Sequence, residues 1–401
     1  MKNIFKLLAF LPLLTACDDL FEPALENNRD LEAMYKEPSY AQGILANAYI
    51  ILPYETSPTS DLATDDAVTN EISSNYLRMA TGSWTANNNP VSQWQNRFNA
   101  IQYINLFLEN VDKVEWAKDE RISTMFLDRL KGEAYGLRAL HMYYLLRAHG
   151  GKIADGTLMG VPIILKSEGP DADFNHARAT YSDCVKQIME DAGKAIELLP
   201  LDYKKFADSE IPEKYKNIGV TNASDYRRVC GEEYRGLMSG RIALAVRAQT
   251  ALLAASPAFQ SGSGMTWEQA ADYAAEIIEK ANGGGGCGLD ADGLEWYTLA
   301  DKDYGTGGSP AEVIWRSSTD DNNTLETANF PPSLYGNGRV NPTQNLVDAF
   351  PMANGYPISE TSGNYNAENP YDNRDPRLAK YIVYNGSKQG PSDTEIITGT
   401  Y

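Results

Sequence analysis

The sequence predicts a mainly α-helical protein, in which helix pairs stack as in a tetratricopeptide-like solenoid and a loop-rich second subdomain carries short strands. Apolar residues recur at helical spacing through the middle of the chain, between recognisable helix starts and stops. A weak self-similarity relates residues 137–139 to residues 246–248. The remaining segments are rich in Gly, Pro, Asn, Asp and aromatic residues, which favours loops.

The helices are predicted in the order 95–111, 123–149, 185–199, 239–255 and 266–281. Glycines follow the second helix, and Pro200 and Pro257 close the third and fourth. Ser239 is placed to cap the fourth helix, and Thr266 with Gln269 has the spacing of a capping box for the fifth. Each predicted helix therefore has at least one local boundary signal or a clear apolar periodicity.

These elements divide the chain into three parts. Residues 1–16 form a signal, and residues 17–282 form a mostly helical scaffold with a loop insertion at about 50–97. Residues 283–401 are loop-rich. Short apolar runs at 312–315 and 380–384 predict brief strands there.

The first sixteen residues predict an export signal. Lys2 and Lys6 begin it, the apolar stretch 7–14 follows, and small residues stand directly before Cys17. The apolar run is too short to span a membrane. Residues 14–17, Leu-Thr-Ala-Cys, resemble the lipobox of bacterial lipoproteins, which implies cleavage before Cys17 and its acylation, for example with palmitate. Ordinary secretion is the alternative.

The charge and the cysteines narrow the class of protein. The formal charge of -19 becomes about -21 once the two signal lysines are removed, and such a surface repels nucleic-acid phosphate and anionic headgroups. We therefore expect no nucleic-acid partner and no membrane contact except through the lipid. With Cys17 acylated, Cys184, Cys230 and Cys287 remain, and the sequence does not choose a disulfide pair among them. Cys184 is predicted to be a small buried residue of a helix.

Signatures of catalysis, cofactors and metals are missing from the sequence. It has no His-Glu-x-x-His, Gly-x-Ser-x-Gly or Walker A motif, and the glycines at 283–288 follow a helix rather than a strand. His141 and His149 lie too far apart on one helix to share a metal, and the acidic turn 290–295 is too short for an EF-hand loop. The acidic pair at 65–66 keeps a surface glycosidase as a third hypothesis, but adjacency does not place two carboxylates across a substrate. We predict no catalytic residue, metal or cofactor.

The best candidate binding feature is a tryptophan beside amides. Three amides follow Trp84 in the same predicted loop: Asn87, Asn88 and Asn89. An indole covers the apolar face of a sugar, and amides supply donors and acceptors for its hydroxyls. A tryptophan tucked under its own loop is the alternative. Tyr335 and Trp296 are further candidates, whereas Trp94 and Trp315 are predicted to be packed.

Three segments resemble those of one family. Residues 342–350, Pro-Thr-Gln-Asn-Leu-Val-Asp-Ala-Phe, are similar to the Pro-Thr-x-x-Leu-Val-Asp-x-Phe segment of the SusD/RagB family. Residues 373–377, Asn-Arg-Asp-Pro-Arg, resemble another motif of that family, and residues 138–162 resemble its Arg-Ala-x-x-x-Tyr…Gly-Gly-Val-Pro segment. Pro351 and Asn354 replace the acidic residues usual at those places.

The resemblance implies a non-catalytic lipoprotein on the surface of a Bacteroidetes-type outer membrane. Such proteins capture glycans or peptides as lids over a TonB-dependent, SusC-like transporter. The resemblance also implies that acidic residues after the acylated cysteine, here Asp18 and Asp19, favour export to the outer surface. Relatives continue beyond the position of Tyr401, so region 283–401 is expected to be incomplete. No ligand contact is carried over from the family.

We therefore expect capture of an oligosaccharide and its delivery to that transporter. A peptide-capturing RagB-type lipoprotein and a helical-repeat scaffold without a small ligand are the alternatives. The motif residues Arg374, Asp375 and Arg377 are expected to be structural, forming buried charge-assisted hydrogen bonds that pin the loops.

Overall fold

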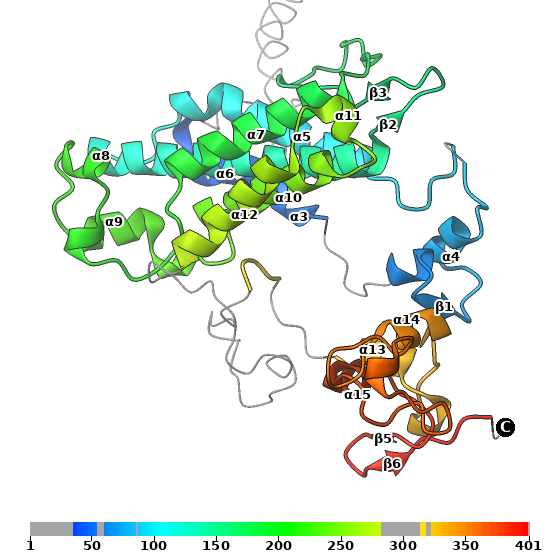
Figure 1. Ribbon diagram of the computed structural model, residues 1–401. Coiled ribbons are helices and arrows are strands. Elements are labelled where there is room, and N and C mark those ends of the chain that lie inside the picture. The colour runs from blue at the N-terminus through cyan, green and yellow to red at the C-terminus, as the bar shows by residue number, and fades with distance from the viewer. Residues whose placement is uncertain (1–34, 54–59, 86, 282–312, 318–321, 400–401) are drawn as a thin grey trace, which may run out of the picture.

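The computed structural model describes residues 35–53, 60–85, 87–281, 313–317 and 322–399. Figure 1 shows a layer of long helices, with a smaller region of short elements beside it. The smaller region combines the segment around α4 (Asn75–Ala80) with the C-terminal residues. Within the described residues, no helix is both long enough and apolar enough to cross a membrane.

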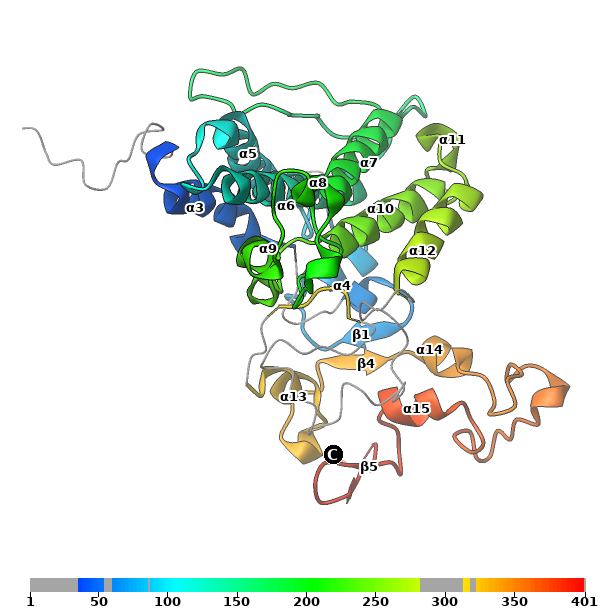
Figure 2. The same ribbon diagram turned by 90° about the vertical axis from the view of Figure 1, so that its left-hand side faces the viewer.

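Among the described residues, the six long helices form the main part of the helical body. They are α3 (Pro38–Ile50), α5 (Trp94–Asn110), α6 (Glu120–His149), α7 (Tyr181–Leu198), α10 (Gly240–Ala255) and α12 (Trp267–Ala281). Helix α6 packs against α5 and α7, α3 packs against α5, and α10 packs against α7 and α12 (Figure 2). One continuous apolar core joins α3, α5, α6, α7 and α10. The predicted mainly helical architecture of stacked helix pairs is confirmed.

Two glycines allow the long central helix to be approached closely. A Cβ on Gly132 would stand 2.6 Å from Leu199 Cγ, and a Cβ on Gly136 would stand 2.6 Å from Met238 Cγ. The two glycines are four residues apart and share one face of α6. That face therefore receives the end of α7 and the residues just before α10.

Local signals begin helices α10 and α12 as predicted, whereas α6 and α7 begin a few residues before the predicted 123 and 185. Ser239 Oγ accepts a hydrogen bond from Ile242 N (3.3 Å) at the start of α10. Before α12, Gln269 N donates to Thr266 Oγ1 (3.2 Å) and Thr266 N donates to Gln269 Oε1 (3.0 Å), so the predicted capping box is confirmed. Shorter elements of the body are β2 (Gly151–Lys152), β3 (Leu158–Met159), α8 (Glu213–Lys216), α9 (Ala223–Cys230) and α11 (Gln260–Ser263).

The loop-rich region contains only short elements. They are the 3-10 turns η2 (Ser60–Ala63), η6 (Pro332–Leu334) and η7 (Thr361–Gly363), the helices α4 (Asn75–Ala80), α13 (Thr324–Asn329), α14 (Gln344–Ala349) and α15 (Pro376–Tyr381), and the strands β1 (Ala67–Thr69), β4 (Val340–Pro342), β5 (Lys388–Gln389) and β6 (Thr394–Glu395). Strand β1 pairs antiparallel with β4, and β5 pairs antiparallel with β6. The first pairing attaches the predicted insertion to the C-terminal segment.

Two predicted strands are wrong. Residues 313–317 have no strand structure, and Lys380 and Tyr381 belong to helix α15. The helix forms there because the Asp375 side chain caps it and Pro376 suits its first turn. Trp315 is packed as predicted, since it lies against the helical core and its Nε1 donates to Gly236 O (2.8 Å).

The cysteines that the structure describes are buried thiols. Cys184 belongs to the main core, as predicted, and Cys230 belongs to a separate cluster around α9. Burial raises the pKa of both thiols. Cys287 lies outside the described residues.

Candidate functional site

Trp84 stands at the entrance to a tight turn that follows α4. Thr85 and Asn88 close this turn, since Asn88 N donates to Thr85 O (3.0 Å) and Thr85 N donates to Asn88 O (3.4 Å). Before it, Ser83 N donates to Arg78 O (3.0 Å) and so ties the chain back to α4. The Trp84 side chain is 45% exposed, so it is not buried under its own loop.

The three amides after Trp84 differ in their exposure to solvent and in their hydrogen bonding. Asn87 and Asn88 are exposed. Asn89 is half-buried, and its Oδ1 accepts a hydrogen bond from Val91 N (3.0 Å). The Asn89 acceptor therefore stabilises the loop itself, and Asn87 and Asn88 are the amides with side chains turned to solvent.

Tyr335 is displayed by a strained turn. Its side chain is 96% exposed, and its φ of 64° lies in the left-handed region, which costs a side-chain-bearing residue about 1–2 kcal/mol. Tyr335 N donates to Pro332 O (3.0 Å), and a Cβ on the next residue, Gly336, would stand 2.0 Å from Phe330 O. Only glycine fits after Tyr335, so the turn has little freedom to relax.

The β1–β4 ribbon connects the two arms that carry Trp84 and Tyr335. Beyond β1, Asn70 Nδ2 donates to Asn337 O (3.0 Å), and Asn70 Oδ1 accepts from Arg339 (3.1 Å). At the other end, Thr343 N donates to Asp66 O (2.8 Å) and Thr343 Oγ1 donates to Asp65 O. Both aromatic residues thus belong to the loop-rich region, on separate loops of it. Trp296, the predicted acylation site Cys17 and the signal 1–16 lie outside the described residues.

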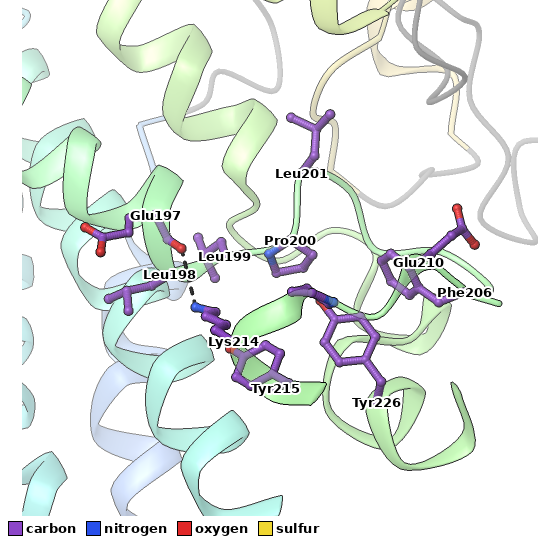
Figure 3. Close-up of a pocket in the computed structure, with 11 residues that line it drawn as sticks. Glu197, Leu198, Leu199, Pro200, Leu201, Phe206, Glu210, Lys214, Tyr215 and Tyr226 are labelled. Atoms are coloured by element: carbon purple, nitrogen blue, oxygen red, sulfur yellow. Dashed lines mark hydrogen bonds between the residues drawn. The ribbon is translucent and has the colours of Figure 1, made fainter. Parts of the chain in front are cut away.

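A hollow of about 340 Å³ lies on the helical body, where α7 ends against α8 and α9 (Figure 3). Its inner wall is aromatic. The centroid of the Tyr226 ring lies 4.9 Å from that of Phe206 and 5.7 Å from that of Tyr215. At its mouth, Lys214 Nζ donates to Glu197 O (3.4 Å). Of the candidate binding residues that the structure describes, none lines this hollow. Three separate chain segments form it, and no local sequence pattern connects them.

The histidines with helical positions are used for packing. His141 is buried, with Nε2 3.0 Å from Ala48 O and Nδ1 3.2 Å from the Arg97 guanidinium. Burial, with a smaller contribution from Arg97, lowers the pKa of His141 to about 3. His149 Nε2 accepts a hydrogen bond from Gln93 N (3.0 Å). Among the described residues, no group of three or more His, Cys, Asp or Glu side chains is arranged to hold a metal ion.

Two family models match the chain. Residues 25–214 match a SusD-like model described as starch-binding and associating with the outer membrane, and residues 311–398 match the model of the SusD family. The chain is a SusD/RagB-like protein. A search of curated proteins finds no match to it.

Solved structures share the fold of this SusD/RagB-like chain. A SusD-like protein from Bacteroides fragilis NCTC 9343 matches with a TM-score of 0.64 and 19% identity, over 92% of this chain and 64% of that one. A SusD-like carbohydrate binding protein from the same strain matches with a TM-score of 0.59 and 20% identity, over 90% of this chain and 62% of that one. The chain therefore spans less than two thirds of their length, and at these identities the likeness shows the fold alone.

The family motif at 373–377 has the structural role that we predicted for its first arginine. Buried Arg374 donates to three backbone carbonyls, those of Val347 (2.6 Å), Phe350 (2.8 Å) and Pro370 (2.8 Å). Asp375 pairs with Arg377 (2.7 Å), whose hydrogen bonds lower the pKa of Asp375 to about 2. Arg377 is about half-exposed, so its predicted burial is wrong, and the buried arginine of the motif is Arg374.

Proposed function

We propose that this SusD/RagB-like chain is a non-catalytic, lipid-anchored surface protein that captures an oligosaccharide and delivers it to a SusC-like, TonB-dependent transporter. The observation that supports glycan capture best is the pairing of exposed aromatic rings with tightly bonded loops. Trp84 and Tyr335 offer flat apolar faces, and Asn87 and Asn88 offer exposed amides near the first ring. Loops that are already ordered lose less entropy when a ligand binds.

Mobility in an affinity gel tests glycan capture. The gels contain soluble starch, a soluble β-glucan or a xylan, and the wild-type chain should be retarded by at least one of them. Trp84→Ala should weaken that retardation by about three- to tenfold, because one aromatic stacking contact is worth about 0.5–1.5 kcal/mol.

Trp267→Ala is the matched control, since Trp267 is 49% exposed but begins helix α12 of the helical body. Its mobility should equal that of the wild type in every gel. Equal mobility of Trp84→Ala would remove Trp84 from the binding site.

The anchor and the partner require separate experiments. Labelled palmitate should enter the wild-type protein in a bacterial host, and Cys17→Ser should abolish the label. The lipid would hold the binding domain close to its channel and raise the effective concentration of one for the other.

Pull-down with a detergent-solubilised TonB-dependent channel should recover a complex, and repeated failure with the acylated protein would contradict the delivery step.

Absence of catalysis is tested on the polysaccharides that the protein binds. Reducing ends should not accumulate when the purified chain is incubated with them. Release of sugar that is lost in the Asp65→Asn/Asp66→Asn variant would instead support a surface glycosidase.

A further inference from the structure

Trp94 is an exposed tryptophan on the helical body, where the sequence predicts a packed one. Its side chain is 43% exposed, because it is the first residue of α5 and stands at the rim of the body. Its inner side is supported by two rings. The Phe98 and His149 rings both contact the indole in edge-on arrangements. Their centroids lie 4.9 Å and 5.4 Å, respectively, from the centroid of the Trp94 ring. The indole is therefore fixed in orientation while part of its surface faces solvent.

Hydrogen bonds hold the backbone beside this ring. Gln93 N donates to His149 Nε2 (3.0 Å), which joins the start of α5 to the end of α6. Trp94 N donates to Ser92 Oγ (3.4 Å), and Arg178 donates to His149 O (2.9 Å). Burial, and then Arg178, lowers the pKa of His149, so its ring is neutral at pH 7 and Nε2 accepts the bond.

Exposed amides lie on the face of α5 that adjoins the face of the indole. Trp94 and Phe98 are four residues apart on one face, and Gln95 and Asn99 share the face that is turned from it by about 100°. The side chains of Gln95, Asn96 and Asn99 are all exposed. The start of α5 thus repeats the chemistry of the Trp84 turn, with an aromatic face and amides beside it, but on a helix of 17 residues.

The two tryptophans are also close along the chain. Trp94 lies six positions after Asn88, which closes the Trp84 turn. Even a fully extended chain of that length spans at most about 21 Å. The backbone of the Trp84 turn is therefore within the length of an oligosaccharide of several sugar units from Trp94.

We propose that Trp94, with Gln95 and Asn99, forms a second glycan-binding surface that stacks on a neutral pyranose ring of an extended oligosaccharide. This inference rests on the proposed function, because it adds a subsite for the same class of ligand. The surface would hold one end of a chain whose other part contacts Trp84, and so it would favour longer oligosaccharides over single sugars.

The test compares Trp94→Ala with Trp267→Ala in the same affinity gels, on the full chain. The control is well matched, since both tryptophans begin a helix and are about equally exposed, but acidic Glu268 and Asp272 are exposed beside Trp267. Trp94→Ala should weaken retardation by about three- to tenfold. Trp267→Ala should leave it unchanged.

Trp94→Ala also removes packing against Phe98 and His149, so its melting temperature must be compared with that of the wild type. If it melts lower, the exposed pair Gln95→Ala/Asn99→Ala decides, since these side chains can be shortened without opening the core. Weaker retardation of the pair variant supports the second surface, and unchanged retardation overturns it.

The two proposals can fail separately. Weakened binding in Trp84→Ala together with unchanged binding in Trp94→Ala, at equal stability, overturns the second surface and leaves glycan capture in place. A wild-type chain that no polysaccharide retards overturns both.

Discussion

Arg138 in the helical body and Arg374 in the loop-rich region are both buried, but they bind different groups. Arg138 on α6 donates to both carboxylate oxygens of Asp191 on α7 (2.7 and 2.8 Å) and to Asn105 Oδ1 on α5 (3.0 Å). Arg374 donates only to backbone carbonyls among the residues that the structure describes. One arginine joins side chains of three helices, and the other joins stretches of backbone.

The difference follows from the length of the elements. Inside a long helix each carbonyl is bonded within the helix, and the guanidinium of Arg138 finds its acceptors on the side chains of Asp191 and Asn105. Helices α14 and α15 have six residues each and leave most of their terminal groups unbonded. A guanidinium has five donors in a fixed fork and can satisfy several such carbonyls at once. The loop-rich region is thus held by side chains that replace missing secondary structure.

The largest effect is expected at the buried ion pair of the helical body. Asp191→Ala leaves the Arg138 charge without its carboxylate in a dry interface, which should lower the free energy of unfolding by about 3–5 kcal/mol. Lys194→Ala is the control, because its ion pair with Glu190 on the same helix is exposed and should cost about 0.5 kcal/mol or less. Denaturant titration of both variants measures this, and similar midpoints would contradict the assigned role of Asp191.

In the loop-rich region the equivalent change should act locally. Arg374→Met removes the donor from three carbonyls and should destabilise residues 344–384 by about 2–3 kcal/mol. Hydrogen exchange should accelerate there while α6 and α7 stay protected. Arg377→Met, in the same motif but half-exposed, should change exchange little. Faster exchange in the helical body would show that the two regions unfold together.

The stabilities of the two regions should also depend differently on pH. The folded pKa of His141, about 3, lies below the unfolded value of 6.5, so the unfolded state binds the extra proton between these limits. The stability of the helical body should therefore fall as the pH drops below about 6.5, by about 2 kcal/mol at pH 5. Denaturant titrations at pH 7 and pH 5 measure this fall. His141→Gln cannot titrate, and it should show a flatter dependence.

The ion pair of the loop-rich region should persist further into acid. Because Arg377 lowers the folded pKa of Asp375 to about 2, the stability from this pair is present above the ordinary aspartate range. It is lost only as the pH falls from about 4 through about 2. Exchange at pH 5 that rises first in residues 373–381 would contradict this order.

The sequence predicts the helical body better than the loop-rich region, because helix signals are local. Ser239, Thr266 and Gln269 lie within three or four residues of the groups they bond, so their roles follow from spacing alone. Strand β1 has three residues and pairs with β4 far along the chain. A segment of three residues is too short to show a periodic pattern. The pairing of β1 with β4 is therefore visible only in the folded chain.

Some features of the candidate site also follow from the local sequence, and others depend on the folded structure. The loop position of Trp84 and its amides follows from composition, but the internal bond of Asn89 does not, because it depends on the conformation of the turn. Trp94 has the apolar spacing of a core residue, and its exposure comes from its place at the rim of the body. The left-handed turn at Tyr335 has no sequence signal either, since tyrosine is not a residue that favours it.

Substitutions at Tyr335 should separate the effect on glycan affinity from the effect on stability. The expected change in the free energy of unfolding is the smallest of those predicted, apart from those of the control variants. Tyr335→Gly relieves the left-handed strain and loses almost no buried surface, so the free energy of unfolding of this region should rise by about 1 kcal/mol. Affinity for a retained polysaccharide should fall about three- to tenfold, because the ring is gone. Tyr335→Ala removes the same ring but keeps the strain, so it should lose affinity without the gain in stability. If both variants bind as the wild type does, this strained display of an aromatic ring serves something other than the glycan.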